Sequence, residues 1–184
     1  MNEASPCSAL LIIDVQEGFL AGSVGVYRGD EFIEVVDSLR CRARNRGMSV
    51  MYTQFNGPPG HPAEAGTRGW QIHEKLKPLD GDLVIGKKST DSFHLSALHD
   101  ELQRRSITRL YVTGCLTELC VDTTCRRAIT LGYEVLLIGD GHTTFDVPVC
   151  DVSPAARILL TNDVMYRIGD GSRHICVINA SDFP

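Results

Sequence analysis

Three reactive side chains, a carboxylate, an ammonium and a thiol, follow short apolar segments of this sequence. Asp14 comes directly after one apolar run, Lys87 comes after a second, and Cys120 lies a short way beyond a third. A carboxylate can accept the proton of a thiol, and a nearby ammonium stabilises the thiolate that forms. If the fold brings these three side chains together, they make an activated sulfur nucleophile.

Each of the three also has an ordinary structural explanation. An Asp after a strand often only tightens a turn. A Lys at a strand end is usually solvated, and a Cys in a helix usually packs as a small apolar side chain. The case for chemistry therefore rests on all three meeting at one place, because three coincident positions are much less probable by chance than one.

The pattern of apolar residues predicts the elements that position these side chains. Short runs typical of buried parallel strands are found at 9–13, 49–55, 83–85, 110–112, 134–138 and 175–178. Helical patterns alternate with them: from Phe32 to Ala43 with an end at Gly47, around Leu95, Leu98 and Leu102, from a Thr117 cap to Gly132, and from Ser153-Pro154 onward. This alternation predicts an α/β fold, a three-layer α/β/α sandwich around a mainly parallel, doubly wound sheet of about six strands, in one domain over residues 1–184.

Ligands of open parallel sheets bind at the carboxyl ends of the strands, and all three reactive residues lie at such ends. Cys120 is expected at the third position of a helix, where unpaired amides and the helix dipole would lower the pKa of its thiol. Lys88 competes with Lys87 for the role of the cation. Because adjacent residues of a strand point to opposite faces, only one of these two lysines can reach the site.

Composition and charge argue against several other classes of protein. The 184 residues are 43% hydrophobic and 22% charged, as in folded globular chains. A net charge of -5 argues against nucleic-acid binding, and no apolar run approaches the roughly 20 residues that span a bilayer. Residues 1–8 lack the basic region of a signal peptide, and the seven cysteines include no Cys-x-x-Cys pair. We therefore expect a cytoplasmic protein with free thiols.

Three segments of the sequence resemble the isochorismatase-like cysteine hydrolases of the nicotinamidase/isochorismatase superfamily. They are Leu-Ile-Ile-Asp-Val-Gln at 11–16, Lys87 placed six residues before Phe93, and Gly-Cys-Leu-Thr-Glu-Leu-Cys-Val at 114–121. The segments occur in the order that the family has, and the similarity extends over about residues 9–146. The last forty or so residues match less clearly.

The resemblance implies a catalytic triad of Cys120, Asp14 and Lys87, in which Cys120 attacks a carbonyl and Asp14 takes its proton. Lys87, preferred over Lys88 by its spacing to Phe93, would orient Asp14 and stabilise developing charge. The resemblance further implies a cis peptide bond between Cys115 and Leu116, which would aim the Leu116 amide, together with that of Cys120, at an oxyanion. The implied reaction forms a thioester, releases an amine or ammonia, and ends with attack by water.

A metal site found in nicotinamidases of this family has no counterpart here. Its first ligands form an Asp-x-His after the second strand, whereas residues 53–57 of this chain are Thr-Gln-Phe-Asn-Gly. His61 and His73 lie in the loop that follows, but two histidines twelve positions apart are more often loop residues than zinc ligands. We therefore predict no metal and no cofactor, and nicotinamide becomes a less expected substrate.

The predicted ligand is a small molecule, with no nucleic-acid or membrane partner. Candidate residues for the substrate pocket follow the strands or flank the turn before Cys120: Gln16, Phe19, Phe55, Trp70 and Thr117. His142 could border the pocket, although hydrogen bonding within its loop is the more ordinary role. Members of this family usually assemble, so the resemblance implies a homo-oligomer, a dimer or larger.

The predicted activity is metal-independent hydrolysis of a C–N bond in a small amide or carbamoyl-type substrate. One alternative keeps the fold but hydrolyses the vinyl ether of isochorismate, a reaction that forms no acyl-enzyme. A second alternative is a binding or redox-sensing protein without turnover, in which Cys115 could act as a resolving thiol for Cys120.

Overall fold

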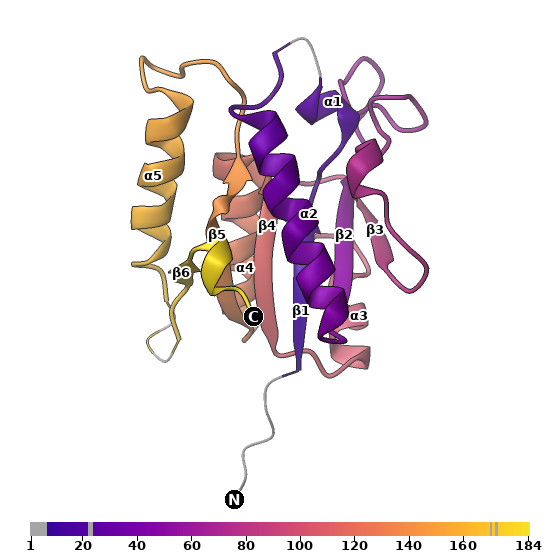
Figure 1. The fold of residues 1–184 in the computed structure, drawn as a ribbon, viewed down its shortest axis with the longest axis vertical. Helices are drawn as coiled ribbons and strands as arrows, with labels where there is room; N and C mark the ends of the chain where they lie inside the picture. The colour runs from indigo at the N-terminus through magenta and orange to yellow at the C-terminus, as the bar shows by residue number, and fades with distance from the viewer. Residues whose placement is uncertain (1–6, 22–23, 170, 172) are drawn as a thin grey trace, which may run out of the picture.

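The computed structural model describes residues 7–21, 24–169, 171 and 173–184, so residues 1–6, used above to argue against a signal peptide, lie outside the described part (Figure 1). Its centre is one parallel sheet with the strand order β3-β2-β1-β4-β5-β6. The strands are β1 (Ser8–Ile13), β2 (Ser49–Phe55), β3 (Leu83–Lys87), β4 (Arg109–Cys115), β5 (Glu134–Thr143) and β6 (Cys176–Ile178). All six predicted strands are present, and β4 and β5 extend further than their apolar runs.

Helices cover both faces of this sheet (Figure 1). They are α1 (Glu17–Leu20), α2 (Gly29–Asn45), α3 (Leu98–Arg104), α4 (Asp122–Thr130) and α5 (Pro154–Met165), with short turns η1 (Glu74–Leu76), η2 (Thr117–Val121) and η3 (Ala180–Asp182). Helix α2 packs its apolar stripe on one face, and α3 and α4 pack on the other. The predicted α/β sandwich is therefore confirmed.

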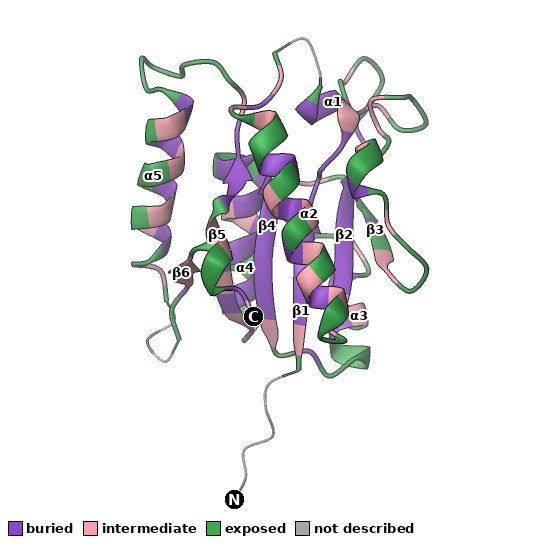
Figure 2. Cartoon of the chain, viewed as in Figure 1, coloured by how far each residue is buried: buried purple, intermediate pink, exposed green. Residues whose placement is uncertain are grey.

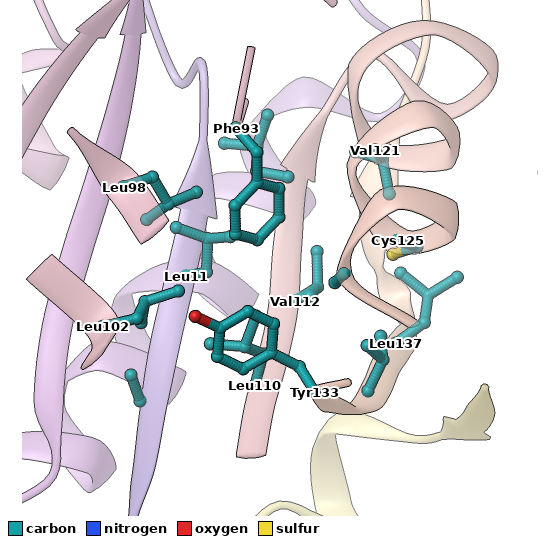
Figure 3. Close-up of a cluster of buried hydrophobic side chains, with 14 of the residues drawn as sticks. Leu11, Phe93, Leu98, Leu102, Leu110, Val112, Val121, Cys125, Tyr133 and Leu137 are labelled. Atoms are coloured by element: carbon teal, nitrogen blue, oxygen red, sulfur yellow. The ribbon is translucent and has the colours of Figure 1, made fainter. Parts of the chain in front are cut away.

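Both faces of the central strands are buried, which explains their continuous apolar sequence. Figure 2 shows β1, β2 and β4 almost wholly buried. Alternate residues of β1 enter opposite cores: Leu10 packs on the α2 side and Leu11 on the α3/α4 side. Figure 3 shows the second of these cores, where Phe93 stacks on Tyr133 with ring centroids 5.8 Å apart.

The sheet reverses its winding between β1 and β4. From β1 the chain moves outward through β2 to β3, then returns to β4 on the other side of β1 and moves outward to β6. Gly114 allows the two central strands to meet: its φ is +132°, and a Cβ there would collide with the backbone of Ile13. This junction is the place where doubly wound sheets bind ligands.

Two of the expected helix details are wrong. Leu95 does not belong to α3; it lies before the helix, with a positive φ and an exposed side chain, so Leu98 and Leu102 alone anchor that helix. Thr117 does not cap the helix after β4, because its hydroxyl is used elsewhere and Leu116 occupies the capping position. The Ser153-Pro154 start is confirmed: Ser153 Oγ accepts a hydrogen bond from the Ala156 amide at 3.2 Å.

Candidate active site

Asp14 and Lys87 form a buried ion pair at the carboxyl edge of the sheet. Lys87 Nζ lies 2.7 Å from Asp14 Oδ2, and both side chains are almost fully shielded from solvent. The ammonium also donates to the carbonyl of Ser89 at 2.9 Å. Lys88 is exposed, as the alternation along a strand requires. Two charges buried together cost much desolvation free energy, so the fold must hold both in a fixed geometry.

The backbone around Asp14 is tied to the neighbouring strands. Its φ is +51°, in the left-handed region that a non-glycine residue seldom adopts outside turns and functional sites. Its amide donates to the Thr53 carbonyl at 3.2 Å, and the Thr53 hydroxyl donates to Asp14 Oδ1 at 2.8 Å. Within the described residues, Oδ2 makes no well-aligned hydrogen bond despite its contact with Lys87. Oδ2 therefore keeps a lone pair for an incoming proton.

Cys120 lies on a π-helical turn, η2, between β4 and α4. The Leu116 carbonyl accepts from the amides of Leu119, Cys120 and Val121, at 3.1, 2.9 and 3.2 Å. The thiol lies beside Asp14 and Lys87. Such π turns are rare and occur often at functional sites. Cys120 is only 7% exposed.

The expected direction of the Cys120 pKa shift is wrong. Burial raises the pKa of the thiol to about 12; the charge of Asp14 also raises it, and Lys87 lowers it. A helix terminus stabilises a thiolate at an exposed first turn, but here the loss of hydration is the larger effect. The resting side chain is therefore a neutral thiol, and the Asp14 carboxylate lies beside it.

The peptide bond between Cys115 and Leu116 is cis in the structure. Burial holds the pKa of the Cys115 thiol well above its usual range, so this thiol stays protonated. Its Sγ donates to the Asp14 carbonyl at 3.0 Å, which links the ends of β4 and β1. The Cys120 amide already donates to the Leu116 carbonyl, so an oxyanion would have to compete for it.

Gln16 and Trp70, two of the candidate pocket residues, connect loops to strands. The Gln16 amide accepts from the Phe55 backbone at 2.7 Å and donates to the carbonyls of Phe55 and Trp70, both at 2.9 Å. Both amide hydrogens are used in this way, leaving no donor for a ligand. The half-buried Trp70 donates its indole N–H to Asn56 Oδ1 at 2.7 Å.

Phe19 and Phe55 form an aromatic wall next to the ion pair. Their ring centroids lie 6.3 Å apart, and Lys87 Nζ is 5.6 Å from the centroid of Phe55. His61 completes the wall at 5.8 Å from Phe19 and 5.2 Å from Phe55, and Phe145 approaches Phe19 at 6.3 Å. A ring face next to an ammonium is a favourable cation–π contact. The wall gives the site an apolar side next to Lys87.

Thr117, the last candidate pocket residue, is buried and bonded to His142. Thr117 Oγ1 lies 2.9 Å from His142 Nδ1, and His142 Nε2 lies 2.8 Å from Asn162 Oδ1. Asn162 Nδ2 donates to the Gly139 carbonyl, which fixes the orientation of the Asn162 amide. Asn162 Oδ1 therefore accepts a hydrogen bond from His142 Nε2. Burial lowers the pKa of His142, so this histidine is a neutral link between η2 and α5.

A groove of about 480 Å³ lies between α2, β5 and α5, and none of Asp14, Lys87 and Cys120 lines it. Its charged residues include Arg28 and Glu31, which pair with each other. The reactive groups, not this groove, define the candidate site.

In the described ranges no three His, Cys, Asp or Glu side chains gather as metal ligands. No described helix is long and apolar enough to cross a bilayer.

Sequence reasoning missed the hydrogen bond from Thr53 to Asp14 and the places of His61 and Phe145 in the aromatic wall. Thr53 gave a usable signal, because a polar residue near the end of a buried strand beside Asp14 needs a hydrogen-bond partner. The positions of His61 and Phe145 depend on how two long loops fold back over the sheet edge, which local patterns do not encode.

Comparison with known proteins identifies the family. Residues 8–151 match the model of the isochorismatase domain. A streptothricin hydrolase from Streptomyces noursei is 36% identical over 82% of this chain and 62% of its own length, and a second one is matched over 55% of its length. The chain thus spans only about three-fifths of the length of these relatives.

A ureidoacrylate amidohydrolase from Cronobacter sakazakii is 27% identical over 72% of this chain and 73% of its own length. The crystal structure of an isochorismatase from Pseudomonas putida KT2440 superposes with a TM-score of 0.87 at 26% identity, covering 99% of this chain and 94% of that one. This chain belongs to the isochorismatase family.

Proposed function

We propose that this protein is a cysteine hydrolase that cleaves the C–N bond of a small amide or carbamoyl-type substrate. The observation that carries the proposal is the buried Asp14–Lys87 ion pair beside the Cys120 thiol, with Asp14 Oδ2 able to accept one more hydrogen. Each partner supplies what a weak nucleophile requires: a base within reach and a positive charge to stabilise the anion.

The first half of the reaction moves one proton and exchanges one bond. Cys120 Sγ attacks the substrate carbonyl carbon while its proton passes to Asp14 Oδ2. Collapse of the tetrahedral adduct breaks the C–N bond, and the protonated Asp14 returns that proton to the leaving nitrogen, releasing an amine or ammonia. The products of this half are the thioester on Cys120 and a regenerated carboxylate.

The second half uses water in place of the thiol. Asp14 takes a proton from water as the oxygen attacks the thioester carbonyl. Cleavage of the C–S bond then releases the acid, and Asp14 returns the proton to sulfur. Lys87 stays paired with Asp14 between the two halves and faces the negative charge that develops. Because the thiol rests in its neutral form, this sequence never requires a free thiolate.

Charge on the carbonyl oxygen needs hydrogen-bond donors. The Leu116 amide, at the cis bond, is the donor we assign to it. The Cys120 amide becomes a second donor only if it leaves the Leu116 carbonyl. Loss of one such donor lowers kcat by about a hundred- to a thousandfold in other enzymes. A change of acceptor by the Cys120 amide, from the Leu116 carbonyl to the oxyanion, would therefore affect kcat.

The substrate class is supported by relatives and by the site. One relative is named for hydrolysis of streptothricin and another for amidohydrolysis of ureidoacrylate. A wall of Phe19, Phe55 and His61 beside Lys87 fits a substrate with one flat or apolar side and one polar end. A homo-oligomer and a cytoplasmic location stay predictions.

The test is a panel of small amides, ureido compounds and lactams assayed with wild-type protein and two variants. We expect hydrolysis of at least one compound, loss of that activity in Cys120→Ala, and an acyl adduct on Cys120 in the intact mass of quenched wild-type protein. Cys125→Ala, which changes a buried thiol outside the site, is the matched control and should keep the activity. Unchanged hydrolysis in Cys120→Ala would overturn the proposal.

The alternatives predict other results from the same panel. Turnover of isochorismate in both wild type and Cys120→Ala, without an adduct, would favour vinyl-ether hydrolysis. A redox sensor needs an accessible thiol of low pKa. Cys120 is buried and its pKa is raised, which argues against that second alternative.

A further inference from the structure

Helix α5 buries polar as well as apolar side chains: Pro154 and Met165 are buried, and so are two polar residues. Arg157 and Thr161 face the protein and are each only 9% exposed, whereas Leu159 and Leu160 point outward and are 69% and 59% exposed. Figure 2 shows α5 at one side of the fold with exposed residues along its outer face. A helix that buries an arginine and exposes leucines is not held by a hydrophobic stripe alone. What its buried polar residues contact must then explain its position.

The Arg157 guanidinium contacts two separate parts of the site. One terminal nitrogen donates to the carboxylate of Glu118, and also to Thr144 Oγ1 at 3.3 Å. The other terminal nitrogen donates to the backbone carbonyls of Phe145 and Val147, at 2.8 and 2.6 Å. Thr144 in turn donates to Glu118 at 3.0 Å. One planar group thus ties together three chain segments, a geometry that suits arginine and not lysine.

The two sets of contacts reach the turn that carries Cys120 and the segment next to the aromatic wall. Glu118 is in η2, two residues before Cys120. Phe145 belongs to the segment after β5, and its ring lies against Phe19 of the aromatic wall. Arg157 lies in α5, beyond the family match that ends at residue 151. The cation on this helix therefore reaches both the turn that carries the thiol and the segment that borders the wall.

We propose that Arg157 is a positioning residue for the nucleophile: through Glu118 it holds η2 in the geometry that keeps Cys120 next to Asp14. The second link from α5, Asn162 to His142 to Thr117, reaches the same turn one residue earlier. With both links in place, η2 is held from outside as well as by its own hydrogen bonds. If the Arg157 link is lost, the turn loosens, the thiol becomes more accessible, and its distance from the base is no longer fixed.

This inference rests on the proposed function, and two readouts distinguish a failure of the inference from a failure of the proposed function. The first readout is kcat on the best substrate of the panel. The second is the rate and pH profile of Cys120 carbamidomethylation by iodoacetamide, with the modified cysteine localised by fragmentation of its peptide. The second needs no substrate, so it tests the position of the turn even if the assigned reaction is wrong.

Three variants probe the link and one serves as a control. Arg157→Met removes the cation, and Arg157→Lys keeps the charge without the planar guanidinium. Glu118→Gln removes the charge of the partner, and because the Glu118 side chain is 35% exposed this change should not prevent folding. Arg167→Met removes an exposed cation from the same stretch, just after α5, where it pairs with Asp163. Circular dichroism verifies that each protein is folded at the assay temperature.

The expected changes have opposite signs for the two readouts. In Arg157→Met, kcat should fall at least tenfold while alkylation of Cys120 at neutral pH becomes several times faster. Glu118→Gln should show the same pair of changes, smaller, and the double variant should not exceed Arg157→Met. Arg157→Lys should be intermediate, and Arg167→Met unchanged.

Three results would overturn the inference. One is a folded Arg157→Met variant whose kcat and Cys120 alkylation rate both stay within twofold of the wild-type values. If Arg157→Met does not fold, the same result in Glu118→Gln overturns the inference. Another is slower turnover with an unchanged alkylation profile, because the turn would then not have moved. The third is additive effects of the two single variants, since a shared link requires non-additivity.

Discussion

The candidate active site at the ends of β1 and β4 and the contact between α5 and the sheet place polar groups in two different ways. At the edge, almost wholly buried strands run into Asp14 and η2, and the topology brings the reactive groups together. At α5, a few side chains such as Arg157 and Asn162 make the connection through hydrogen bonds. The difference teaches that the reactive groups are placed by apolar packing, whereas their fine alignment depends on individual polar contacts.

Removing the base should have the largest effect. Asp14→Asn keeps the size of the side chain but cannot accept the thiol proton, so we expect kcat to fall by about a hundred- to ten-thousandfold. The variant leaves the buried Lys87 without its counter-charge, which lowers stability, so thermal denaturation followed by circular dichroism verifies that it is folded at the assay temperature. A loss below tenfold would mean that another group takes the proton.

Disturbing the junction of β1 and β4 should be the next largest effect, and it acts on stability. In Gly114→Ala the added methyl meets the Ile13 backbone and the residue must keep a φ of +132°, so unfolding should cost about 3 kcal/mol less. Urea denaturation measures the change. Gly171→Ala, at a positive φ with open space around it, is the control and should lose much less.

Weakening the orientation of the base should be milder. Thr53→Val removes the hydroxyl that donates to Asp14 Oδ1 at 2.8 Å but keeps the shape of the side chain. A hydrogen bond to a charged group contributes about 1.5–3 kcal/mol, so kcat should fall by about tenfold or more. Thr53→Ser keeps the hydroxyl and should keep the activity that Thr53→Val loses. That result would assign the fall in kcat to the lost hydroxyl and not to altered packing.

Acidification should act on the contact between η2 and α5. Because the pKa of His142 is lowered in the folded protein, protonation favours the unfolded chain. The stabilising contribution is complete above the ordinary pKa of about 6.5 and is lost as pH falls through the lower folded value, by at most about 1.4 kcal/mol per pH unit. His142→Gln should flatten this part of the stability curve. An unchanged curve would show that His142 titrates normally.

Sequence alone predicted the strands and the meeting of Asp14, Lys87 and Cys120, because continuous apolar runs and parallel topology determine both. It gave the wrong direction for the Cys120 pKa, since helix position is visible in a sequence but the depth of burial is not. It also placed Gln16 in the pocket, where loop contacts use its amide. Arg157 was invisible for a related reason: one arginine in a weakly patterned helix looks like a solvated charge.

The central claim, that a neutral Cys120 thiol transfers its proton to Asp14, is tested most directly by the pH dependence of Cys120 alkylation in three proteins. Wild type should show a rate that still rises at about pH 10, well above the ordinary thiol pKa of about 8.5, as a value of about 12 requires. Asp14→Asn should lower the midpoint, because a negative charge is removed, and Lys87→Met should raise it. A midpoint at or below the ordinary value, unmoved by either substitution, would contradict the account.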